Sequence, residues 1–195
     1  MKRLKTVIIF TILAALVVSY YLYLSNRKPK TVKGTPASVS EVNDIINLKL
    51  ETNYPDTPRE LVTLYCRITK AYYKTKLSES QIEKLGTKAW GLFDLELQNA
   101  CISLPDYMVS LKSDIKTWNK EGMYVNEYIV ESNSDIDYVT YGGGKQAAIV
   151  RVQFYIRKGS NLIPTIHEFY VGKNSNGKWK ILSWHIPQAE TEAAS

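Results

Sequence analysis

Histidine and cysteine are scarce in this chain, which has two of each among its 195 residues. The cysteines are not spaced as Cys-x-x-Cys, and no cluster offers the three or four ligands of a zinc site. His167 and His185 are expected on one face of the last two strands, with Glu168 on the opposite face. A third ligand is therefore missing, and the sequence indicates neither a metal site nor a cofactor.

Motifs that would identify an enzyme are also missing. The segment Gly142-Gly-Gly-Lys145 lacks the spacing and the following Ser or Thr of a phosphate-binding loop, and it stands between two predicted strands, where a hairpin turn is expected. The chain has 14 tyrosines, so an acid such as Asp94, Asp106 or Glu168 is expected to lie near a tyrosine by chance. Such a pair therefore does not indicate the acid and base of an isomerase. We expect a protein that is not an enzyme.

An excess of one charge is missing from most of the chain, although the whole chain carries a net charge of +6. Seven of the 25 basic residues precede Gly34, where there is no acid, so residues 35–195 hold 18 basic and 19 acidic residues and a net charge of −1. A nucleic-acid-binding domain would carry a basic surface. The sequence therefore predicts no nucleic-acid partner.

One long apolar run stands out at residues 6–24, which contain no charge, Pro or Gly. A helix of that length is about 28 Å long, close to the thickness of the hydrocarbon core of a bilayer. The run ends in a bulky stretch, Ser19-Tyr-Tyr-Leu-Tyr23, without the small-x-small pattern of a signal-peptide cleavage site. We expect an uncleaved single-pass anchor in the cell membrane; a slowly cleaved signal peptide is the alternative.

The expected domain organisation follows from that anchor. Residues 1–5 form a short cytoplasmic tail, 25–37 a polar linker, 38–187 one α+β domain outside the cell, and 188–195 a flexible tail. Basic residues flank the apolar run on both sides and suit contacts with lipid headgroups. Because their numbers on the two sides are nearly balanced, the reverse orientation, with the domain inside the cell, stays open.

Three capping boxes predict helices in the first half, beginning at Ser38, Thr57 and Ser78. The middle helix, 58–76, places a stripe of apolar residues on one face, and a further helix from about Asp106 ends at Gly122. The inward residues of these two helices are Leu61, Leu64, Tyr65, Ile68 and Tyr72, and then Tyr107, Leu111, Ile115 and Trp118.

The second half changes to a period of two, as residues 148–157 show most clearly. Further strands are expected at 124–131, 136–141, 163–171 and 178–186. Helices followed by strands predict an α+β fold with helices packed on an antiparallel sheet. The last strand is apolar on both faces, so it is either central in the sheet or covered on its outer face by a partner.

Three stretches, NYPDTPRELVTLYCRITKAYY (53–73), LFDLELQNA (92–100) and NGKWKILSWHI (176–186), resemble the nuclear-transport-factor-two-like family. They also resemble a family of membrane-anchored proteins of Gram-positive bacteria. The resemblance implies a cystatin-like cone, in which a curved sheet wraps around helices and leaves a mouth. Members of the wider superfamily include isomerases, ligand-binding modules and scaffolding subunits of secretion machines, so the fold does not select one role.

Two sets of candidate site residues follow. Tyr155, Trp179 and Trp184 are the expected aromatic anchors of a partner surface on the outer face of the sheet. The expected lining of the cone is Tyr65, Tyr72, Val152 and Phe154. Cys66 and Cys101 can form a disulfide outside the membrane, or stay as free thiols.

These observations lead to one preferred function and one alternative. The preferred function is a membrane-anchored scaffold that binds a protein partner or self-associates, as an accessory subunit of an envelope or translocation complex. The alternative is a small ligand or peptide in the mouth of the cone, with isomerase-like chemistry.

Overall fold

The computed structural model describes residues 39–73 and 77–187. The expected cytoplasmic tail, anchor, linker, first capping serine and carboxy-terminal tail lie outside these residues. Within the described ranges, no helix has the length and apolar character needed to cross a bilayer. Residues 35–195 form one compact unit, described by itself below.

Among the described residues, five helices occupy the first half of the domain: α2 (Val39–Asn47), α3 (Pro58–Tyr72), α4 (Glu79–Leu92), α5 (Leu95–Ala100) and α6 (Leu104–Lys120). The capping boxes predicted for α3 and α4 are confirmed, since Thr57 and Ser78 each accept a hydrogen bond from the residue three positions later. The helix α3 ends at Tyr72, four residues before the predicted end. Gly122 adopts φ +64° after α6, where it ends the helix as predicted.

Five antiparallel strands form one sheet: β1 (Met123–Val130), β2 (Asp137–Tyr141), β3 (Lys145–Lys158), β4 (Asn161–Lys173) and β5 (Trp179–His185). The strand order is β1-β3-β4-β5, and β2 pairs with the other end of β3 beside β1. All five predicted strands are confirmed within a few residues. Of the two alternatives for the last strand, the central position is wrong, because among the described strands β5 pairs with β4 alone and forms an edge.

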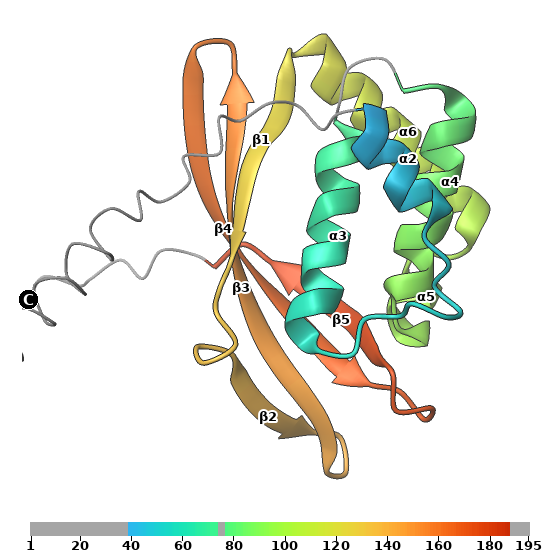
Figure 1. Cartoon of the computed structure of the whole chain (residues 1–195), viewed down its shortest axis with the longest axis vertical. Helices are drawn as coiled ribbons and strands as arrows, with labels where there is room; N and C mark the ends of the chain where they lie inside the picture. Colours follow the sequence, from blue (N-terminus) through green and yellow to red (C-terminus); the bar gives the residue numbers. More distant parts are fainter. Residues whose placement is uncertain (1–38, 74–76, 188–195) are drawn as a thin grey trace, which may run out of the picture. The chain divides into compact units, whose positions relative to one another are not determined.

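The helices cover one face of the curved sheet, which we call the inner face, and leave the other, the outer face, open (Figure 1). Alternation along β3 sends Ala148, Val150, Val152 and Phe154 to the inner face, where all four are buried. Apolar residues of α3 and α4 pack on them, and the stripe predicted for α3 is buried apart from the half-buried Tyr65. The α+β class predicted from the sequence is therefore confirmed.

A β-bulge explains the apolar residues on both faces of β5. Leu182 and Ser183 together oppose the single residue Tyr170 of β4. The extra residue shifts the alternation, so that Ile181 and Trp184 both lie on the inner face instead of opposite faces. A second register shift lies between Val125 and Glu127 in β1.

The free edge of β5 is partly covered by the junction between α4 and α5. Phe93 forms a parallel bridge with Ile181, and the Asp94 amide donates a hydrogen bond of 2.9 Å to the Ile181 carbonyl. The side chain of Asp94 also accepts from the Glu96 amide and caps α5. One short segment therefore begins a helix and covers part of a strand edge.

Candidate functional site

The described elements leave the outer face of the sheet without a packed layer (Figure 1). Single apolar residues on a protein surface are common, but several of them on one open sheet face indicate a candidate contact surface. By register, five exposed apolar side chains lie on this face: Ile129, Val139, Tyr141, Leu162 and Ile166. Half of the surface of Ile129 and Ile166 is exposed, at 51% and 50%.

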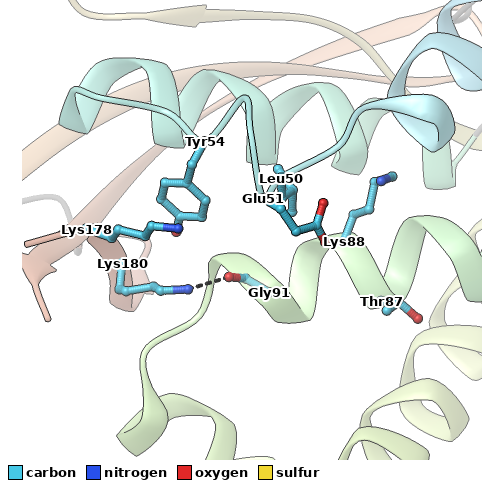
Figure 2. A pocket seen from close by; sticks show the side chains of 8 residues that line it. All are labelled: Leu50, Glu51, Tyr54, Thr87, Lys88, Gly91, Lys178 and Lys180. Carbon is cyan, nitrogen blue, oxygen red and sulfur yellow. Dashed lines mark hydrogen bonds between the residues drawn. The ribbon is translucent and has the colours of Figure 1, made fainter. Parts of the chain in front are cut away.

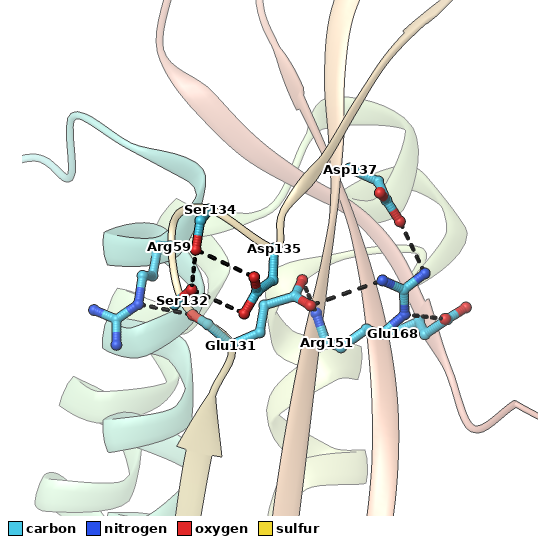
Figure 3. Close-up of polar contacts among 8 residues, drawn as sticks. All are labelled: Arg59, Glu131, Ser132, Ser134, Asp135, Asp137, Arg151 and Glu168. Carbon is cyan, nitrogen blue, oxygen red and sulfur yellow. Dashed lines mark hydrogen bonds and ion pairs between the residues drawn. The ribbon is translucent and has the colours of Figure 1, made fainter.

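A charged row crosses the middle of the outer face between these apolar residues. Arg151 of β3 lies beside Glu168 of β4, which in turn lies beside His185 of β5. The Arg151 guanidinium donates to Glu168 at 2.9 Å and to Asp137 at 2.9 Å, and it lies 3.7 Å from Glu131 (Figure 3). We call Glu131, Asp137, Arg151, Glu168 and His185 the charged row.

Hydrogen bonds to both its backbone and its side chain hold Glu131, the residue that follows β1. The Glu131 carboxylate accepts a bond of 2.6 Å from the Arg151 amide, and its carbonyl accepts one of 2.8 Å from Arg59 of α3. In the turn that follows, Ser132 and Ser134 both donate to Asp135 (Figure 3). The backbone of Glu131 is therefore held from the helix side, and its carboxylate is held from the sheet.

The electrostatics of the charged row leave it acidic. Three carboxylates surround one guanidinium, which gives a net charge of −2 when His185 is neutral. Burial raises the pKa of Glu131, and Asp137 and Asp135 raise it further, whereas the bond from the Arg151 amide and the charge of Arg151 lower it. The pKa of Arg151 is raised by its bonds to Glu168 and then Asp137. Exposed ion pairs contribute only about 0–1 kcal/mol each, so the row matters more for what this face attracts than for stability.

The structure separates the three aromatic anchors expected on the outer face. Tyr155 lies there, half-buried, between Glu127 and Pro164 in the register. Trp179 is on the inner face and only 6% exposed. Trp184 is also on the inner side because of the bulge, and its ring lies 5.5 to 6.1 Å from those of Tyr65, Phe93 and Phe169. Trp179 therefore belongs to the core, whereas Trp184 packs on inner-face aromatic rings and stays 37% exposed, so neither is an outer-face anchor.

The expected lining of the cone belongs to the packed core. Tyr72, Val152 and Phe154 are buried, and the Tyr72 hydroxyl donates to the Leu85 carbonyl at 3.3 Å and lies 3.2 Å from the Tyr107 hydroxyl. The ring of Tyr65 packs against those of Phe93, Phe169 and Trp184. Side chains thus fill the space between α3 and the sheet at these positions.

The bulge also separates the two histidines. His167 is on the inner face beside Phe154, with ring centres 4.9 Å apart, and burial lowers its pKa. His185 is on the outer face, stacked on Tyr170 and 3.5 Å from Glu168. The expectation that both share one face is wrong, since it assumed regular pairing without a bulge. Among the described residues, no group of three or more His, Cys, Asp or Glu side chains is placed to hold a metal ion.

Both cysteines are free thiols, so the disulfide that the sequence permits is not formed. Cys66 is buried in the core, and burial raises the pKa of its thiol, which keeps it protonated. Cys101 follows α5 at a half-buried position.

The sequence analysis had placed Tyr155 on the outer face of β3, but it did not identify the rest of the outer-face site. Ile129 and Ile166 occupy outward positions of their strands, and Glu131, Asp137 and Glu168 approach Arg151 only through the pairing of β1, β2 and β4 with β3. The available signal in the sequence was which residues of each predicted strand point outward. The sequence did not show which residues of neighbouring strands pair, and this pairing brings these positions into one row.

Comparison with known proteins gives one family match. Residues 1–184 match a family model described as "Domain of unknown function (DUF6715)". No curated protein matches the chain.

Proposed function

The chain belongs to the DUF6715 family, and we propose that it is a membrane-tethered, non-enzymatic module that binds a protein partner through the outer face of its sheet. The proposal keeps the cone fold of the nuclear-transport-factor-two-like family for residues 38–187. Residues 6–24 are the proposed anchor, with the domain outside the cell, as in the membrane-anchored proteins of Gram-positive bacteria that the sequence resembles.

The observation that carries the proposal is the arrangement of the outer face: apolar side chains on both sides of an acidic row. Along β4, Ile166, Glu168 and Tyr170 follow at every second residue, which spaces them by about 6.8 Å. A strand laid against this face with an apolar, a cationic and an apolar residue at alternate positions has the same spacing. We therefore assign the partner as a β-strand or sheet face with a cation between two apolar side chains.

Charge argues against a second copy of this chain as the occupant. In a two-fold dimer formed through the outer face, the acidic row of one copy would meet the same row of the other. Like charges held together in this way cost binding energy, whereas an arginine or lysine of the partner gains it. Self-association through this face would therefore contradict the assignment.

A ligand in the mouth of the cone receives less support. The side chains of Tyr72, Val152 and Phe154 are buried in the core and pack where such a ligand would lie.

The partner assignment can be tested with the fragment 35–195 and two disulfide-closed β-hairpin peptides. One hairpin presents Val-Arg-Val at alternate positions, and the other presents Val-Glu-Val. NMR titration should place the first on Ile129, Glu168 and Ile166, with an affinity at least about tenfold higher than that of the second.

Two substitutions separate the charged and apolar contributions. Glu168→Gln should reduce the preference for the arginine hairpin, and Ile166→Asn should weaken both peptides. Val109→Asn is the matched control, because Val109 is an exposed apolar residue of α6 on the helix side. Equal affinity for both hairpins, or shifts away from the outer face, would contradict the assignment, and so would dimerisation of the free fragment that Ile166→Asn abolishes.

The tether has a separate test. Protease added to intact cells should remove the domain from the full-length protein, and the protein should stay in the membrane fraction. A mature chain recovered from the medium without its first thirty or so residues would disprove the anchor.

A further inference from the structure

A pocket of about 340 Å³ lies away from the outer-face site, where three distant parts of the chain meet. The connection between α2 and α3 supplies Leu50, Glu51 and Tyr54, and β5 with the turn before it supplies Lys178 and Lys180 (Figure 2). The last turns of α4 complete the lining with Thr87, Lys88 and Gly91. These side chains are distant in the sequence and come together only when the domain folds.

Two lysines share one aromatic ring in this pocket. The Nζ atoms of Lys178 and Lys180 lie 4.9 and 5.0 Å from the centre of the Tyr54 ring. The Tyr54 hydroxyl donates a hydrogen bond of 2.8 Å to the Trp179 carbonyl, between the two lysines in sequence, which fixes the ring. Figure 2 shows both ammonium groups beside the ring, with Glu51 on the other side of the pocket.

These positive charges are not neutralised by direct ion pairs. Within the described ranges, neither Lys88, Lys178 nor Lys180 forms an ion pair with a carboxylate. Burial lowers the pKa of Lys180 and the charge of Lys178 lowers it further, whereas the charge of Asp94 raises it. The cation pair is therefore held in place without a carboxylate paired to either ammonium group.

Helix capping accounts for part of this arrangement. Lys180 donates to the Gly91 carbonyl in the last turn of α4, and Lys88 donates to the Leu48 carbonyl just after α2. Such bonds satisfy carbonyl groups that have no partner at the end of a helix. Each uses one of the three N–H groups of an ammonium, and the Lys178 ammonium forms no hydrogen bond with the described residues, so capping leaves most of the donors free.

We propose that this pocket binds a phosphate monoester, with Lys178 and Lys180 as the groups that contact the phosphate. A dianion offsets two ammonium groups that otherwise repel each other, and lysine binds phosphate as a point charge. The Tyr54 ring and Leu50 offer apolar contact to the organic part of the ligand. Glu51 favours a hydroxyl or ammonium group at the other end of that ligand.

The same chemistry can come from a free phosphorylated solute or from the headgroup of a lipid. The fragment 35–195 is suited to separate them, because it forms one compact unit and lacks the basic residues before Gly34. The probes are glycerol 3-phosphate, inorganic phosphate, and phosphatidylcholine vesicles with and without phosphatidic acid. NMR signals of the lysine side chains report on each lysine separately.

We expect saturable shifts of the Lys178 and Lys180 signals and a higher pKa for Lys180 in the bound state. Lys178→Gln should weaken binding at least about tenfold, which is the usual effect of losing a hydrogen bond to a charged group. The Lys178 side chain is exposed and forms no hydrogen bond or ion pair with the described residues, so this variant should fold normally. Lys180→Gln is a second variant, checked by circular dichroism. Lys116→Gln removes an exposed lysine of α6 and is the matched control.

Binding of glycerol 3-phosphate identifies a free solute as the ligand class, and binding to phosphatidic acid vesicles alone identifies a lipid. The proposal is overturned when no probe gives a saturable shift at Lys178 and Lys180. Equal affinity of the wild type and Lys178→Gln would overturn it as well. These outcomes are independent of the hairpin experiments, which concern the outer face.

Discussion

Deletion of Leu182 tests the bulge that sets the two faces of β5. Without it, Ile181, Ser183 and Trp184 can pair one-to-one with Val171, Tyr170 and Phe169, and both Ile181 and Trp184 stay on the inner face. The aromatic contacts of Trp184 are then kept. Full burial of a leucine contributes about 1.5–3 kcal/mol, and Leu182 is half-buried, so the deletion should cost about 1–1.5 kcal/mol.

Urea unfolding of the fragment 35–195, followed by tryptophan fluorescence, measures this cost. Deletion of Gln153 is the matched control, because Gln153 of β3 pairs one-to-one with Ile129 and Ile166. Its removal shifts half of a central strand by one residue and turns buried side chains outward, so no cooperative unfolding is expected. The reasoning fails if loss of Leu182 costs more than about 4 kcal/mol, or if both deletions have the same effect.

Two further predictions concern the core. Phe169→Ala should lower the free energy of unfolding by about 3–5 kcal/mol, because Phe169 is fully buried against Tyr65 and Trp184. Urea denaturation measures this loss, and a loss below about 1 kcal/mol would contradict the prediction. Ile163→Ala, an exposed position of the same strand, is its control. His167→Gln should make the loss of stability on acidification less steep. Burial lowers the pKa of His167, so the charged ring is disfavoured in the folded state. The free energy of unfolding of the wild type therefore falls as the pH drops from the unfolded-state pKa of 6.5 towards the lower folded-state pKa. Urea midpoints between about pH 7.5 and 5.5 measure this slope, and an unchanged slope in the variant would contradict it.

Local sequence patterns predicted most of the helices and strands. Capping boxes at Thr57 and Ser78 and the alternation in residues 148–157 each have a direct physical cause, and each led to the correct element. A bulge has no such signature, since one extra residue in an apolar strand looks like a strand with two apolar faces. The prediction for Trp184 failed for that reason, and so did the pairing of the two histidines.

The two surfaces could be predicted less well, because both depend on contacts between distant segments. The outer-face row requires the register of four strands around Arg151. The lysine pocket requires Tyr54, from the segment before α3, to lie against the Lys178-Trp-Lys180 stretch at the start of β5. Both stretches had been singled out in the sequence for family resemblance, but the sequence contains no information on their contact that reasoning from patterns could use.

The bridge from Phe93 and Asp94 to Ile181 limits how copies of this domain can associate. An unpaired strand edge invites a neighbouring chain to add its own strand, and repeated addition produces fibres. Here the Ile181 carbonyl already has its donor, so a second chain cannot extend the sheet past that point without first displacing the start of α5. Many copies crowded on one surface could then sit side by side without polymerising through β5, and Asp94→Pro, which removes the donating amide, would weaken that protection.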